Sequence, residues 1–163
     1  MKKELKLLFE NTFRFLITDY NFNVISTKTD NGGFSLLAKN LTTGVKIIYE
    51  LREAYIHIIL YKLIDGEIVR NTVSAIKNAE PINGFELGWI IELKNPEAQL
   101  KPVYEYGIES PFYDEKNGRK NYVEFVADRL KEYAGDILSG DFSTFSTLDK
   151  MVKEHCKNYN KNE

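Results

Sequence analysis

The stretch from Val45 to Asp65, VKIIYELREAYIHIILYKLID, constrains the fold more than any other part of the chain. Apolar and polar side chains alternate along it, except at a charged elbow, Glu50-Leu51-Arg52-Glu53. Alternation with a period of two is typical of β-strands, and a short polar break between two such runs favours antiparallel pairing. The stretch therefore predicts a hairpin at the centre of a small antiparallel sheet.

Neighbouring segments extend this sheet. Strand patterns also occupy residues 22–28 and 34–39, and short polar turns separate them. The second strand of the hairpin, residues 55–64, is largely apolar on both faces, which predicts a central strand that is covered on both sides or nearly so. Asp65-Gly66 is a strong hairpin signal, and residues 67–73 are a candidate fifth strand at the sheet edge. Short strands with short turns favour a meander over βαβ units.

Amphipathic helices are expected at both ends of the chain. Apolar residues at helical spacing cover residues 3–18, and a second stripe runs from Tyr122 to a C′ glycine at Gly140. Residues 146–149, Ser-Thr-Leu-Asp, have the pattern of a capping box that opens a last helix. We predict one α+β domain over residues 1–163, an antiparallel meander sheet of four to five strands with an N-terminal helix and two C-terminal helices packed on it.

The irregular segment 74–118 interrupts this pattern. It holds all 4 prolines of the chain. Within it, residues 85–93 are compatible with a short helix or a strand, and we expect a helix that packs Trp89 or Ile90 inward. No folding requirement accounts for the composition of the segment, so we expect function to lie between Pro81 and Arg119.

Charge and composition exclude several classes of protein. The net charge is -2 and the chain has no basic block, so nucleic acid is not an expected partner. The longest apolar stretch, residues 58–61, is far too short to span a bilayer, so no membrane partner is expected. The single cysteine, Cys156, fits a reducing compartment, and the first residues lack a signal-peptide pattern. We expect a cytoplasmic protein, and its oligomeric state is left open.

The inventory of reactive side chains argues against catalysis. A zinc or iron site needs three or four clustered ligands, but the 2 histidines, His57 and His155, lie outside any metal-binding spacing. Cys156 and His155 are adjacent on a predicted helix and therefore point about 100° apart. No glycine motif for phosphate or dinucleotide binding occurs. We predict no catalytic residue, no metal and no cofactor; an enzyme that uses carboxylates with Arg52 is a third-ranked alternative.

Arg52 lies in the elbow beside Glu50. An exposed ion pair there would contribute about 0–1 kcal/mol. A partly buried pair that fixes the hairpin would matter more, because its rupture costs roughly 3–5 kcal/mol. We expect a structural ion pair between Arg52 and Glu50.

The segment 103–119 combines aromatic and acidic residues and is the best candidate for binding a partner. Tyr and Phe beside acids supply rigid anchors with a polar rim, as protein interfaces do. Alternatively, these aromatic side chains cap the core beneath a long loop. The candidate partner-binding residues are Tyr104, Glu105, Tyr106, Phe112 and Tyr113.

Several short patterns occur in order: an FxFL helix, the hairpin VKIIYELRxxYIxI, a DG turn, and a closing LxxYA and GDFS. In this order they resemble a group of small bacterial proteins, some of which are similar to immunity proteins of toxin systems. The residues that carry the resemblance are Phe15, Leu16, Tyr49, Arg52, Tyr55, Ile56, Ile58, Asp65, Gly66, Tyr133, Ala134, Gly140, Asp141 and Phe142. The resemblance implies a non-enzymatic cytoplasmic protein that binds and neutralises a toxin domain.

Two functions therefore remain as hypotheses. The first is a protein-binding module, with a toxin domain as the partner. The alternative is a small-molecule-binding domain with a pocket between sheet and helices, lined by Tyr49, Tyr55, Tyr61 and Trp89.

Overall fold

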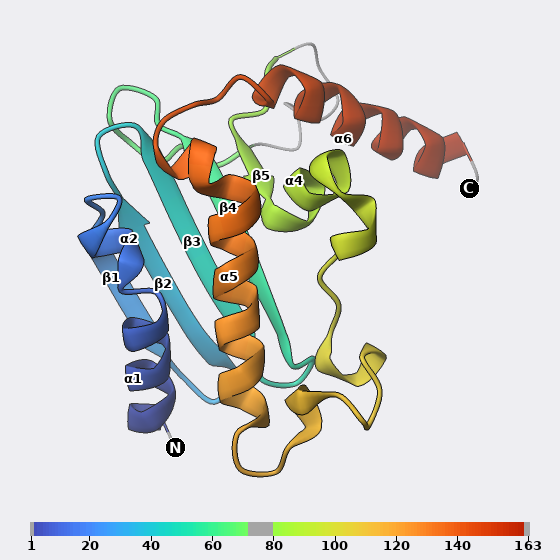
Figure 1. Cartoon of the computed structure of the whole chain (residues 1–163). Coiled ribbons are helices and arrows are strands. Elements are labelled where there is room, and N and C mark those ends of the chain that lie inside the picture. The colour runs from blue at the N-terminus through green and yellow to red at the C-terminus, as the bar shows by residue number, and fades with distance from the viewer. Residues whose placement is uncertain (1, 72–79, 162–163) are drawn as a thin grey trace.

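The computed structural model describes residues 2–71 and 80–161. Over these residues it contains one 5-stranded antiparallel sheet in the order β1-β2-β3-β4-β5. Helices α1, α2 and α5 lie across one face of the sheet, as Figure 1 shows. The predicted α+β class, with terminal helices packed on a meander, is confirmed. The elements are α1 (Lys2–Thr12), α2 (Phe15–Thr18), β1 (Asn23–Thr29), β2 (Gly33–Lys39), β3 (Thr43–Glu50), β4 (Tyr55–Lys62), β5 (Gly84–Glu86), α4 (Leu87–Lys94), η1 (Pro96–Ala98), η2 (Val103–Glu105), η3 (Pro111–Tyr113), α5 (Gly118–Leu138) and α6 (Phe145–Lys161).

The predicted hairpin is β3 and β4, and its register decides which side chains share a face. Tyr49 pairs with Ile56 and Ile47 with Ile58. All four side chains are buried beneath the helices. Phe9 of α1, for example, lies 5.5 Å from Tyr49 between ring centroids. The alternation seen in the sequence is therefore the pattern of a sheet with one face in the core.

The opposite face of the sheet is covered less completely. On β4, Tyr61 is buried, whereas Tyr55, His57 and Ile59 are only half-buried. The expectation of a central strand that is covered on both sides or nearly so therefore holds for the position of β4, but on this second face the cover is complete only at Tyr61. As a result, polar groups of β3 and β4 reach solvent on this side.

The end of β4 partly follows the prediction. Asp65 and Gly66 have φ values of +52° and +76°, as a type I′ turn requires, and Ile64 and Glu67 exchange backbone hydrogen bonds of 3.0 Å. The expected fifth strand at residues 67–73 does not form over 67–71, and residues 72 and 73 lie outside the described residues. The fifth strand is instead β5, which pairs antiparallel with β4.

The segment 85–93 is both strand and helix. Its first two residues end β5, and α4 begins at Leu87. Ile90 is fully buried and Trp89 is half-buried. The expected short helix with an inward side chain is therefore correct from Leu87 onward.

The helices depart from the prediction at their ends. The expected helix over residues 3–18 is interrupted between α1 and α2. Gly140 has φ +90° and donates its N–H to Ile137 O at 3.0 Å, which confirms the C′ glycine. The capping box was wrong, because α6 begins at Phe145 and residues 146–149 lie inside it.

The outermost strand, β1, carries a β-bulge. Its register against β2 shifts between Val24 and Ser26, where Ile25 is the extra residue. Val24 and Ile25 are both exposed. Within residues 2–71 and 80–161, β1 pairs with β2 alone, so its other side has no strand beside it.

Candidate functional site

The aromatic and acidic segment, residues 103–115, lies beside the start of α5 at the lower right of Figure 1. Two of its rings pack on the core. The Tyr106 and Phe112 rings are 4.9 Å apart between centroids, and they lie 5.9 Å and 5.1 Å from the Phe125 ring of α5. Phe112 also lies 5.4 Å from Tyr122. These two aromatic residues therefore cap the core, as the alternative interpretation predicted.

Hydrogen bonds and close packing hold this segment in place. Tyr122 donates its hydroxyl hydrogen to Lys101 O at 2.9 Å, and the Lys101 N–H donates to Tyr106 Oη at 3.1 Å. Burial raises the pKa of the Tyr106 and Tyr122 phenols. At Gly118, a Cβ would lie 2.2 Å from the backbone oxygen of Phe112, so only glycine fits there.

Most of the other side chains of the segment are exposed, whereas Val103 packs against the core and Ser110 is half-buried. Tyr104 is 62% exposed, Ile108 79% and Tyr113 42%. Glu105 and Glu109 are exposed beside them. Of the five predicted binding residues, Tyr104, Glu105 and Tyr113 are therefore available to a partner, whereas Tyr106 and Phe112 support them from beneath.

The expected ion pair between Arg52 and Glu50 does not form. Within residues 2–71 and 80–161, Arg52 is exposed and no ion pair joins it to Glu50. Arg52 lies in the turn between β3 and β4, where hydration competes well with a surface ion pair. The pairing register of β3 and β4 is instead determined by the burial of alternate side chains on one face of the sheet.

The open face of the sheet carries a group of three potential metal ligands that the sequence analysis did not anticipate. Glu50, Glu53 and His57 each offer one ligand atom, and these atoms lie within 4.8 Å of one another. His57 Nδ1 also lies 2.6 Å from Glu86 Oε1 of β5. The predicted hairpin could have brought Glu50 and His57 together, because both side chains belong to the same sheet face. Glu86 had no such signal, because β5 was not predicted.

A tyrosine borders this group. Tyr55 pairs with Glu50 across the hairpin, and its ring lies 4.6 Å from the His57 ring between centroids. Burial raises the pKa of Tyr55 to about 12, and the Glu86 carboxylate contributes to the increase. The phenol therefore stays protonated at neutral pH.

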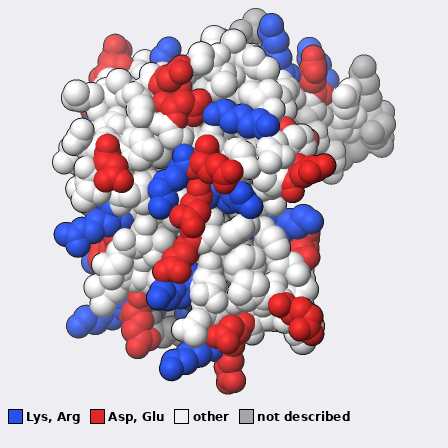
Figure 2. Space-filling view, viewed as in Figure 1, with Lys and Arg blue, Asp and Glu red and all other residues white. Residues whose placement is uncertain are grey.

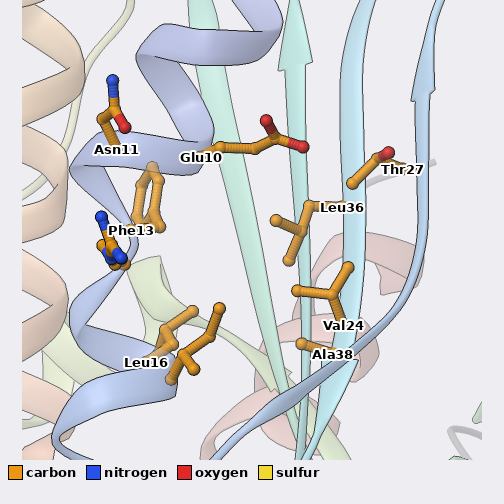
Figure 3. Close-up of a pocket in the computed structure, with 10 residues that line it drawn as sticks. Glu10, Asn11, Phe13, Leu16, Val24, Thr27, Leu36 and Ala38 are labelled. Carbon is orange, nitrogen blue, oxygen red and sulfur yellow. The ribbon is translucent and has the colours of Figure 1, made fainter.

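A groove of about 380 Å³ lies between the N-terminal helices and the first two strands. Figure 3 shows Phe13 and Leu16 of the helical side opposite Val24, Leu36 and Ala38 of the strands. Glu10 and Thr27 add polar atoms at one end. Its volume lies within the range of small-ligand pockets.

The pocket expected for a small molecule does not form from the predicted residues. Tyr49 lies on the helix-covered face of the sheet, whereas Tyr55 and Tyr61 belong to the opposite face. Trp89 of α4 lies 5.2 Å from the His155 ring of α6. The four residues therefore cannot line one pocket, because the sheet separates them.

Charges are mixed over the surface. Figure 2 shows Lys and Arg side chains interspersed with Asp and Glu on the helix-covered face. No described helix combines the length and the apolar character that crossing a membrane requires. The chain matches no known protein-family model, no curated protein and no solved structure.

Proposed function

We propose that the protein is a non-enzymatic protein-binding module that recognises a basic surface of its partner through residues 103–115. The observation that carries this proposal is the exposure of Tyr104, Ile108 and Tyr113 on a segment whose other aromatic rings pack against α5. Large apolar side chains that are held rigidly at the surface are the usual energetic centres of protein interfaces.

The anchored rings reduce the cost of binding. Tyr106 and Phe112 are already packed, so the segment loses little conformational entropy when a partner binds. This preorganisation distinguishes the segment from an ordinary flexible loop, whose ordering would oppose association.

The charge of the segment indicates the kind of partner. Residues 103–115 contain Glu105, Glu109, Asp114 and Glu115 and no basic residue. An acidic rim around apolar anchors complements a basic surface, accelerates encounter and makes association sensitive to salt. The resemblance to toxin-immunity proteins supports a toxin domain as the partner.

A co-expression assay with the product of the neighbouring gene tests this function. We expect the wild-type chain to bind that product and to restore growth of cells that produce it. Changing Tyr104 and Ile108 together to Ser should weaken binding by about tenfold or more and reduce the rescue. Leu41→Ser is the matched control, because Leu41 is 95% exposed but lies in the turn between β2 and β3.

Two outcomes would contradict the proposal at different levels. Equal binding by wild type and by the Tyr104 and Ile108 variant would show that residues 103–115 are not the interface. If the wild-type chain neither binds the neighbouring product nor restores growth, that product is not its partner and the toxin assignment is refuted.

A further inference from the structure

The hairpin brings two potential metal ligands to the open face of the sheet. Ile48 pairs with His57 and Glu50 pairs with Tyr55, so Glu50 and His57 are diagonal neighbours on adjacent strands. Side chains in this relation lie about 7–8 Å apart at their backbones, within reach of long residues. Glu53 belongs to the turn that joins the same two strands, and the ligand atoms of all three residues lie within 4.8 Å of one another.

Glu86 orients the histidine from a third strand. Its Oε1 lies 2.6 Å from His57 Nδ1. When Nδ1 donates its hydrogen to this carboxylate, Nε2 keeps a lone pair that it can give to a metal. Histidines that bind metals commonly donate their other ring N–H to a carboxylate, which fixes the ring and makes the free nitrogen more basic.

The negative charge of the group is not neutralised by basic side chains. Among the described residues, none of Glu50, Glu53 and Glu86 forms an ion pair with Lys or Arg, and Glu86 is instead the hydrogen-bond partner of His57. Arg52 lies in the same turn but is exposed and pairs with neither carboxylate. Carboxylates held this close repel each other, and a bound cation removes that repulsion.

We infer that Glu50, Glu53 and His57 bind one divalent transition-metal ion of the zinc type, with Glu86 positioning His57. One imidazole nitrogen and two carboxylate oxygens suit such an ion, and water completes its coordination at a surface site. Metal–ligand distances of about 2.0–2.2 Å require the ligand atoms to close to within about 3.5 Å of one another. Metal binding therefore requires the Glu50 and Glu53 side chains to rotate toward His57. The site is independent of the proposed function of residues 103–115.

Titration of tag-free, chelator-treated protein with ZnCl₂ tests the site. We expect one Zn²⁺ per chain, with an increase in melting temperature. Glu53→Gln should weaken the affinity at least tenfold, and because Glu53 is an exposed turn residue this variant is expected to keep the fold. Glu86→Gln should weaken it by about 10–100-fold, because the histidine loses its orienting carboxylate.

His155→Gln is the matched control, because His155 is the other histidine of the chain and lies near Glu92, Trp89 and Glu86 at a second surface depression. We expect His155→Gln to bind Zn²⁺ like the wild type. Substitution by Co²⁺ gives a second readout, since its visible absorption should change with Glu53→Gln and not with His155→Gln.

Three results would overturn the inference. The first is the absence of stoichiometric binding by the wild type. The second is unchanged affinity in Glu53→Gln. The third is loss of binding in His155→Gln alone, which would place the metal at the other histidine and leave His57 and Glu86 as an ordinary hydrogen-bonded pair.

Discussion

Asn40 joins three parts of the chain with a single side chain. Its Nδ2 donates to Tyr20 O at 3.0 Å and to Leu138 O at 3.1 Å, beyond the end of α2 and at the end of α5. Its Oδ1 accepts from the backbone N–H groups of Thr42 at 3.0 Å and Thr43 at 2.8 Å. The turn between β2 and β3 is therefore tied to both helical regions that cover the sheet.

Removal of this side chain should destabilise the protein. In Asn40→Ala the two N–H groups and two carbonyl groups lose their partners, and we expect a loss of about 2 kcal/mol in the free energy of unfolding. Urea unfolding measures it. The adjacent exposed Leu41→Ala should change stability by less than about 0.5 kcal/mol. Similar stability of the two variants would show that water replaces the Asn40 hydrogen bonds without cost.

Among the elements, α6 is attached to the rest of the molecule by the buried side chains of Phe145 and Leu148 and by polar contacts. Asp149 accepts a hydrogen bond from the backbone N–H of Ile82 at 2.8 Å and pairs with Lys153 at 3.0 Å. Lys153 also donates to Glu80 O at 2.7 Å. These contacts bind α6 to the chain that leads into β5.

The Asp149→Ala variant should loosen this attachment. The Ile82 N–H loses its acceptor, and Lys153 loses its paired carboxylate, at a cost of about 1–3 kcal/mol. Faster hydrogen exchange at the Ile82 amide, together with a lower urea midpoint, would report the change. Lys150→Ala, an exposed neighbour on the same helix, serves as control. Unaltered exchange at Ile82 in Asp149→Ala would mean that another contact holds α6.

The long strands were predictable because burial of one face imposes strict alternation on their sequence. β5 is different, since it has only 3 residues and pairs with β4 across the chain that follows the Asp65-Gly66 turn. A strand this short shows no apolar–polar alternation. Because its partner is distant in sequence, it also lacks a hairpin-turn signal. The interruption near Phe13 was missed for a related reason: the apolar stripe continues through it, with both Phe13 and Leu16 buried.

The candidate sites were predictable to different degrees. The segment 103–115 was recognised by composition, but the division between anchored and exposed rings depends on Tyr122 and Phe125 of α5, which local sequence does not place. The Glu50 and His57 pair could have been predicted from the hairpin register, since the two residues are diagonal neighbours on one face, but it was not. Its completion by Glu86 required the unpredicted strand β5.

Over the whole molecule, stability should fall at alkaline pH. Burial raises the pKa of Tyr55 to about 12 and also raises the pKa of Tyr61, Tyr106 and Tyr122. Phenolates therefore form more readily in the unfolded chain, where the tyrosine pKa is about 10. The contribution of the protonated tyrosines to the free energy of unfolding is complete below about pH 10. It is lost as the pH rises through the higher tyrosine pKa values of the folded state.

Urea unfolding at a series of pH values from 8 to 12 measures this effect. We expect the free energy of unfolding to decrease with pH above about 10, and Tyr55→Phe to make the decrease shallower. An equally steep decrease in Tyr55→Phe would show that Tyr55 ionises equally readily in the folded and unfolded states.

The bulge in β1 has a consequence for crowded solutions. An outer strand with regular spacing offers a template on which another chain can add, and repetition of that step produces fibres. At Ile25 the extra residue breaks the even spacing of the exposed N–H and C=O groups, and Lys28 adds a charge further along the same strand. One inserted residue, Ile25, thus opposes much of the edge-to-edge aggregation that β1 would otherwise favour.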